Sequence, residues 1–419
     1  MSEFKVTFKT LTPLWTGDAR GECDELKLTG LIGSLRWWFE ALVRGMGYKA
    51  CDSTGDKKCQ IEIRNPDDVL NIHKKICPVC YLFGTTGWKG RFSVSIENDS
   101  NLSKPYNNGK VVVNIDGGRG WHYESGLMGQ ATLTFQYEDM IIGKIEEKGD
   151  KKTLTMKEVF PSILKILFYL ISEYGMLGAK TSMGYGVIKV VQFKIDGKDM
   201  SVSVLKGDWK NFENYLKLFN SEFQENINYL PNLKDFFFVK FDVIDSIDNV
   251  INNVKIFFSY QGGIIETDAI DKWKSENWCI TSPVIRKEIR KKIKDKFSGN
   301  NKLRHFLMGK VAGNKTKFSA IQVSHVYKKS EDSLEFRIYG WLPDIGSISG
   351  KAEDIIQLLQ QLFQDLPWKD RYNANQSRQV DLLPSEIQLG VCWDLSKGNL
   401  SLVEDKIKEL FNISGGSEV

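Results

Sequence analysis

The sequence predicts an α+β protein with two ferredoxin-like units in tandem and a cysteine-containing insertion in the first unit. Segments in which apolar and polar residues alternate, typical of half-buried strands, are interspersed with segments of helical periodicity. In the first half of the chain their order is strand–helix–strand–strand–helix–strand, the split βαβ pattern of that fold. The same ingredients recur in the second half, which we interpret as a diverged duplicate of the first.

A length of 419 residues is enough for two domains. We expect the first unit at 1–200, with its insertion at about 45–110, a connecting helical segment at 201–235, and the second unit at 236–419. The most apolar stretch, 159–177, is interrupted by Lys165 and Glu173. We therefore expect a buried helix there and no membrane segment.

The first unit opens with the alternating segment FKVTFKTLTPLW, which predicts a strand. Ser34 is the predicted N-cap of the helix that follows. One face of this helix carries an apolar stripe that we expect to be buried: Leu35, Trp38, Phe39 and Leu42. The later elements are expected to be strands at Val111–Asp116 and Ala131–Tyr137, a helix at Met156–Tyr174, and a strand after a glycine-rich loop.

Arg36, Trp37 and Arg44 lie off the apolar stripe of that first helix. An aromatic ring beside cationic side chains is a suitable stacking platform for a nucleobase. Alternatively, Trp37 packs beneath the insertion. Both readings are consistent with the sequence.

The second unit begins with the apolar segment FFFVKFDVI, which predicts a strand. A basic helix follows, with one apolar stripe formed by Ile285, Ile289, Ile293 and Phe297. The remaining elements are expected to be strands at 318–328, 334–343 and 387–395 and a helix at 351–366.

Positive charge is concentrated in this second unit. From Arg286 to Lys329, fourteen Lys or Arg residues stand against two acidic ones, a local net charge of +12 in a chain of net charge +4. Such an excess indicates an anionic partner, although a solvated helix face with basic loops is the alternative. The candidate RNA contacts here are Arg286, Arg290, Lys291, Lys310, Lys315 and Lys317.

A glycine-rich loop, GAKTSMGYG, lies between the last helix and the last strand of the first unit. Glycines let backbone amides approach a ligand, and successive amides can form an anion-binding concavity. The loop is not a P-loop, because the order of residues differs and a strand follows it. A simple turn between two elements is the alternative. The candidate RNA-binding residues are Gly178, Lys180, Ser182, Gly184 and Gly186.

Four of the seven cysteines follow the spacing C-x7-C-x17-C-x2-C, at Cys51, Cys59, Cys77 and Cys80. A C-x2-C pair with two further thiols can hold one tetrahedral structural zinc ion, which would stabilise the insertion. His73 is a possible substitute ligand, and free thiols or a redox pair are the alternatives. Because no secretory signal is present and the cysteine count is odd, we expect a reducing cytoplasm.

No set of residues indicates catalysis convincingly. The four histidines form no metal-ligand or nucleophile pattern, and His122, in a glycine-rich loop, is the one candidate general base. We therefore expect no catalytic residues.

Four segments together resemble the RAMP superfamily of CRISPR proteins, and within it the first RAMP subunit of the type III-B (Cmr) effector complex. They are LTPLWTG, LTGLIGSLRWWFEALVRG, CPVCYLFGTTGW and LGAKTSMGYGVI, all in the first half of the chain. The resemblance implies two ferredoxin-like, RRM-like domains with the glycine-rich loop at an RNA surface.

The resemblance further implies a non-catalytic, RNA-binding subunit for antiviral defence. It would bind near the 3′ end of the CRISPR RNA and its target duplex, beside other Cmr RAMP subunits. Because the RRM stacking motif is absent, contact should be mainly with the RNA backbone. The competing interpretations are a metal-independent endoribonuclease acting on CRISPR RNA, with His122 as base, and a protein–protein adaptor whose basic region binds an acidic subunit.

Overall fold

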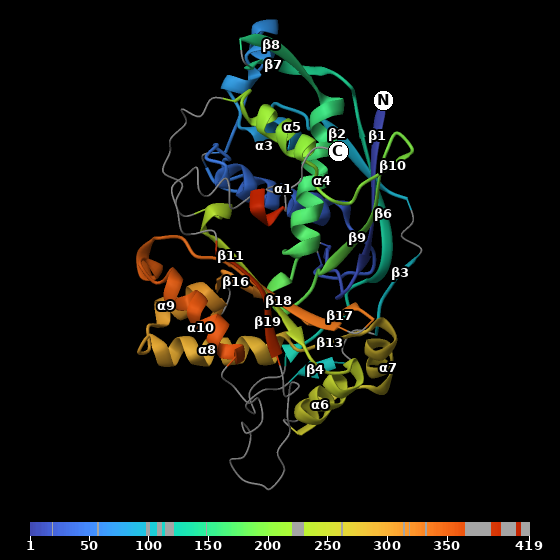
Figure 1. The fold of residues 1–419 in the computed structure, drawn as a ribbon, viewed down its shortest axis with the longest axis vertical. Helices are drawn as coiled ribbons and strands as arrows, with labels where there is room; N and C mark the ends of the chain where they lie inside the picture. The colour runs from blue at the N-terminus through green and yellow to red at the C-terminus, as the bar shows by residue number, and fades with distance from the viewer. Residues whose placement is uncertain are drawn as a thin grey trace.

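The computed structural model is an α+β structure with two large antiparallel sheets, one from each half of the chain (Figure 1). It describes residues 1–18, 20–56, 58–97, 101–106, 111–113, 121–147, 149–219, 230–260, 263–312, 315–317, 319–331, 333–364, 387–394 and 408–411.

The first sheet has the strand order β10-β9-β1-β6-β2, with β3 pairing to β6. All of its neighbouring strands are antiparallel. In β1, every second residue from Phe4 to Phe8 is fully buried, which is the alternation read from the sequence. The strands are β1 (Ser2–Thr10), β2 (Phe92–Ile96), β3 (Leu102–Ser103), β6 (Met128–Tyr137), β9 (Ile188–Ile195) and β10 (Lys198–Met200).

Helices α1 (Leu28–Gly45) and α4 (Met156–Glu173) connect β1 to β2 and β6 to β9, and they pack on each other. A capping box formed by Thr155 and Glu158 fixes the start of α4. The remaining helices of this half are α2 (Pro66–Leu70), α3 (Pro78–Phe83) and α5 (Lys206–Leu216), with 3-10 turns at Ile72–Lys74, Thr181–Met183 and Leu233–Asp235.

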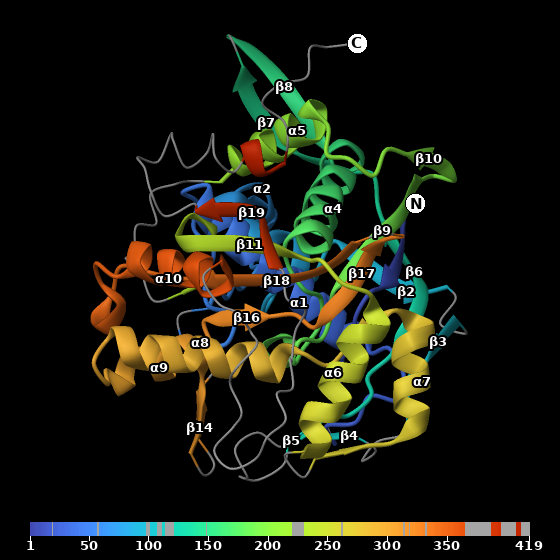
Figure 2. The ribbon, with the colours of Figure 1, turned by 60° about the horizontal axis from the view of Figure 1, so that its bottom comes forward.

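The second sheet has the strand order β13-β17-β18-β11-β19, with β16 pairing to β18. Figure 2 shows α8 and α10 together on one side of it. The strands are β11 (Phe236–Val243), β13 (Trp278–Cys279), β16 (Ile321–Val323), β17 (Val326–Ser330), β18 (Ser333–Trp341) and β19 (Ile387–Asp394). The helices are α6 (Ile247–Tyr260), α7 (Thr267–Glu276), α8 (Ser282–Lys296), α9 (Asn301–Met308) and α10 (Ala352–Gln364), with a 3-10 turn at Gly346–Ile348.

Smaller sheets complete the structure. The short strands are β4 (Val111–Val113), β5 (Trp121–His122) and β12 (Ile264–Ile265) in one sheet, the hairpin β7 (Ile141–Glu147) and β8 (Asp150–Thr155), and the hairpin β14 (Lys310–Ala312) and β15 (Lys315–Lys317). No helix in the described part of the chain combines the length and the apolar character needed to span a membrane.

Two expectations about the elements were wrong, and two helices were not foreseen. The strand that pairs with β6 is β2, from a segment assigned to the insertion, whereas Val111–Val113 pairs with β5 and β12 and residues 114–116 lie outside the described part. Helix α1 begins at Leu28, so Ser34 is inside it and is not its N-cap. Helices α6 and α7, between β11 and α8, were not foreseen.

The two sheets are joined by a buried polar network centred on Arg337 of β18. Its guanidinium donates hydrogen bonds to the carbonyl oxygens of Ser172 (2.9 Å) and Gly175 (3.2 Å), at the C-terminal end of α4. It also donates to Tyr327 Oη (2.8 Å) and pairs with Glu335 (3.5 Å). A cation at a helix C-terminus complements the helix dipole, so this network fixes one half of the chain against the other.

Candidate nucleic-acid interface and metal centre

The glycines of the GAKTSMGYG loop allow close packing against neighbouring segments. A side chain at Gly178 would meet the Trp15 carbonyl oxygen at 2.5 Å, and one at Gly184 would meet the ring of His325 at 2.6 Å. The amides of Gly178, Ala179 and Gly184 donate to Ser34 Oγ, the Trp15 carbonyl and the Thr181 carbonyl. The glycines therefore seat the loop between α1, the chain after β1 and the second half of the molecule.

Lys180, in the same loop, is held in place by two neighbours. Its Nζ forms an ion pair with Glu124 and lies 3.3 Å from the centre of the Trp15 ring. The next residue, Thr181, donates a hydrogen bond to Gln322 Oε1 (3.0 Å), so the loop contacts the second sheet directly. Ser182 is half-buried beside it.

A pocket of about 560 Å³ opens where α1, this loop and the second sheet meet. Trp37, on the exposed side of α1, and Gly178 both line it, so two of the predicted RNA-binding residues come together here. Trp38 is fully buried, as expected, and its Nε1 donates to the Met176 carbonyl (3.1 Å). The second half contributes mostly aromatic and polar walls: Phe236, Phe306, Ser319, Ala320, Gln322, Tyr339 and Trp341.

Arg36 and Arg44 do not line the pocket with Trp37. Arg44 is 8% exposed and donates to the carbonyl oxygens of Ala50, Cys51 and Pro231. Arg36 donates to Glu40, to the Gly84 carbonyl and to Cys80 Sγ (3.2 Å). Both arginines therefore fasten the cysteine segment to α1, and neither lines the pocket.

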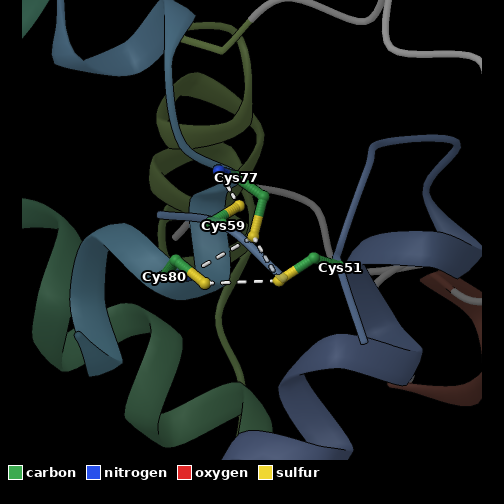
Figure 3. A group of neighbouring side chains, drawn as sticks. All are labelled: Cys51, Cys59, Cys77 and Cys80. Carbon is green, nitrogen blue, oxygen red and sulfur yellow. Dashed lines mark hydrogen bonds between the residues drawn. The ribbon is translucent and has the colours of Figure 1, made fainter. Parts of the chain in front are cut away.

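The four predicted cysteines form one cluster, as Figure 3 shows. Cys77 and Cys80 come from the start of α3, and Cys51 and Cys59 from the chain after α1. All four sulfur atoms lie within 4.8 Å of one another, with 3.4 Å between Cys51 and Cys80 and 3.9 Å between Cys51 and Cys77. Four thiolates at ~2.3 Å from a tetrahedral zinc ion are about 3.8 Å apart, so the donor set fits zinc.

The surroundings of the cluster act differently on its four thiols, and hydrogen bonds with Cys51 and Cys59 raise the pKa of Cys77 and Cys80. Backbone amides donate to two of the sulfurs, from Cys77 to Cys59 and from Cys80 to Cys77, at 3.4 Å each. Hydrogen bonds from the other three thiols hold the pKa of Cys51 well below its usual range. His73 is not part of the cluster; it is half-buried and stacks on Tyr81 at 4.9 Å, and desolvation lowers its pKa to about 4.

Some cations of the basic helix α8 form hydrogen bonds within the protein, whereas others are exposed to solvent. Arg286 is buried: it donates to the carbonyls of Ile321 (3.0 Å) and Met308 (2.8 Å), and burial lowers its pKa to about 10. Arg290 is half-buried and donates to the carbonyls of Met308 and Gly309. These two residues therefore hold α8 to its own unit.

The outer face of α8 presents its cations to solvent. Ile285, Ile289 and Ile293 are buried, as the stripe predicted, and Lys291 and Lys294 on the other side are exposed. Neither lysine has an ion-pair partner among the residues that the structure describes, whereas Lys296 pairs with Asp354 at 3.1 Å. Lys310, Lys315 and Lys317 lie in the β14–β15 hairpin, and their side chains are outside the described part.

The histidines do not form a catalytic arrangement in the described part of the chain. His122 is exposed in β5. His325 is fully buried between Gly184, Tyr185 and Trp278, and burial lowers its pKa to about 3.

In the comparison with known proteins, the family match falls in the first half of the chain. Residues 7–189 match the family model of the RAMP superfamily. No curated protein sequence matches the chain.

Solved structures similar to this chain include the apo crystal structure of Cmr1 from Pyrococcus furiosus, with 13% identity, a TM-score of 0.34, and coverage of 85% of this chain and 96% of that chain. A chain of the type III-B Cmr-beta cryo-EM structure bound to cognate target RNA has 12% identity, coverage of 86% and 99%, and a TM-score of 0.38. In the structure that also contains AMPPnP and ssDNA, the TM-score is 0.41 at 12% identity and the same coverage. The family match makes residues 7–189 a RAMP-superfamily region, as the sequence motifs indicated.

Proposed function

We propose that this chain is a non-catalytic RNA-binding subunit of a type III-B CRISPR effector complex. The RAMP-superfamily match over residues 7–189 carries the proposal. Its partners would be CRISPR RNA, target RNA and other Cmr subunits. The protein would hold the RNA backbone while base pairing between guide and target reads the sequence.

The strand orders support two ferredoxin-like units. The order β9-β1-β6-β2, with α1 and α4 as crossovers, is matched by β19-β11-β18-β17, with α8 and α10 in the corresponding positions. Each is a split βαβ arrangement with its first strand between the third and the fourth. The second unit thus repeats the first and adds the cationic face of α8.

The exposed lysines of α8 support contact with a polyanion. Lys291 and Lys294 are three residues apart and therefore lie on the same side of the helix. Unpaired cations in such a row contribute the salt-dependent part of RNA binding. Arg36, Arg44 and Arg286, whose donors are used within the protein, are assigned structural roles instead.

Assembly of the full chain with type III-B subunits and CRISPR RNA, followed by ultraviolet crosslinking, tests this function. We expect the chain to enter the complex and to form RNA adducts at α8 and near Trp37. Entry without RNA adducts would identify an adaptor instead. Specific cleavage of CRISPR RNA that His122→Ala abolishes would identify an endoribonuclease.

We also propose that Cys51, Cys59, Cys77 and Cys80 hold one structural zinc ion. The spacing of the sulfurs and the two donating amides support this assignment. The ion would join the chain after α1 to the start of α3, a segment with little regular structure of its own. Elemental analysis of protein purified without chelator should give about one zinc per chain, and finding none would contradict the proposal.

A further inference from the structure

The pocket between the two units is hollowed out of one face of α1. Gly30, Gly33, Ser34 and Trp37 line it and follow one another at helical spacing, so three small residues form a recess that ends at the indole of Trp37. The opposite wall is aromatic, with Phe306 and Trp341 in contact at 5.6 Å between ring centres. The volume of 560 Å³ lies within the ~300–1,000 Å³ typical of ligand pockets.

Gly33 indicates that the recess is kept open. A side chain at Gly30 would meet the Thr16 carbonyl oxygen at 2.6 Å, which accounts for that glycine by packing. A side chain at Gly33 would meet nothing within 4 Å. Because a glycine inside a helix lowers stability and no packing contact requires this one, its effect in the structure is to leave the pocket unfilled.

The chemistry of the walls fits a flat, uncharged, aromatic group with a polar edge. None of the described lining residues is acidic or basic. Trp37 is 37% exposed and makes T-shaped contacts with Trp38 and Phe236, at 87° and 62° between the ring planes. Ser34, Thr181 and Gln322 add polar side chains to the lining, and Thr181 donates a hydrogen bond to Gln322 Oε1.

The helices that form and back one wall of the pocket carry cations. Lys302 is exposed and stands one helical turn before Phe306 in α9, so both belong to the same side of that helix. Arg286 of α8 donates to Ser319 Oγ at 3.3 Å, and Ser319 lines the pocket. Helix α8, which carries Lys291 and Lys294 on its exposed face, is therefore packed directly behind the pocket wall.

We infer that this pocket receives one nucleobase, unstacked from an RNA strand whose phosphates meet the lysines of α8 and α9. The inference rests on the proposed RNA-binding function and adds a base-stacking site to backbone contact. Aromatic side chains stack on bases of any sequence, so the site would position the strand without reading it.

The test uses the full-length protein and single-stranded RNA that carries 2-aminopurine at successive positions. Binding should quench 2-aminopurine fluorescence at one position, where the base stacks in the pocket. Gly33→Leu fills the recess and should abolish this quenching and weaken binding by about 5- to 150-fold, the range for loss of one base–aromatic stack. The dependence of affinity on salt should stay unchanged, because no phosphate contact is removed.

Gly33→Ala is the matched control, since a single methyl group enters open space and the helix gains propensity. It should keep the quenching, and both variants should unfold at or above the wild-type temperature. Equal quenching in Gly33→Leu, or RNA binding without quenching at any position, would overturn the pocket and leave the proposed function intact. Failure of the wild-type protein to bind RNA would overturn both.

Discussion

Removing Arg337 should loosen the attachment between the two units. This guanidinium is 4% exposed and makes hydrogen bonds to two carbonyl oxygens at the end of α4 and to Tyr327. Arg337→Met leaves those carbonyls without their donor and removes a cation from buried Glu335, which is 1% exposed. Because Lys329 still pairs with Glu335 at 2.9 Å, the cost comes mainly from the lost hydrogen bonds of the guanidinium, about 1.5–3 kcal/mol for each.

Urea unfolding followed by far-UV circular dichroism measures this loss. Arg64→Met is the matched control, because Arg64 and Glu62 form an ion pair at 2.7 Å with side chains 75% and 73% exposed; such pairs contribute at most about 1 kcal/mol. Adding Glu335→Gln to Arg337→Met should recover little of the loss, because Glu335 keeps its ion pair with Lys329 at 2.9 Å when Arg337 is removed. A cost no larger than that of Arg64→Met would refute the role given to this network.

Three further predictions follow from single features. Gly33→Ala should raise the free energy of unfolding by about 0.5–1 kcal/mol, measured by urea unfolding, because the helix gains propensity and the methyl group meets no neighbour; a loss of stability would mean that the site is already filled. Zinc content should fall from about one per chain to none in Cys77→Ser with Cys80→Ser and stay at one in Cys23→Ser, since Cys23 lies outside the cluster; equal zinc content in the two variants would contradict the site. Burial lowers the pKa of His325 in the folded state to about 3, whereas in the unfolded chain the pKa of this histidine is 6.5. Between these two values only the unfolded chain binds a proton at His325, so the free energy of unfolding decreases as the pH falls from about 6.5 to 3. Between pH 6.5 and 4.5 the wild type should lose about 2 kcal/mol more than His325→Phe, and parallel pH profiles would show that His325 does not contribute.

Periodicity predicted the long elements because each buries one face. The alternation in β1 and the apolar stripes of α1 and α8 all appear in the structure with the expected residues inside. The start of α1 was missed because Gly30 and Gly33 interrupt the helical pattern without breaking the helix. Strand β2 was missed because a short alternating segment does not reveal which sheet it joins.

The site was predicted in part. The cysteine spacing was enough to place four sulfurs together, since a C-x2-C pair and two further thiols can converge at one point. The arginines beside Trp37 were expected to contact RNA, but their donors bond to the cysteine segment, and helical spacing cannot show what packs on a polar face. The pocket could not be foreseen, because its walls come from α1 and from residues about 300 positions away, around β16 and β18.

The salt dependence of RNA binding tests the central claim most directly. Affinity of the full chain for single-stranded RNA should fall steadily with salt, and Lys291→Glu with Lys294→Glu should flatten the log–log slope by about 1.4, two phosphate contacts at ~0.7 each. The control, Lys151→Glu with Lys198→Glu, makes the same change of charge at exposed lysines of the first unit and should keep the wild-type slope. Equal slopes for both double variants would contradict the claim that α8 holds an RNA backbone.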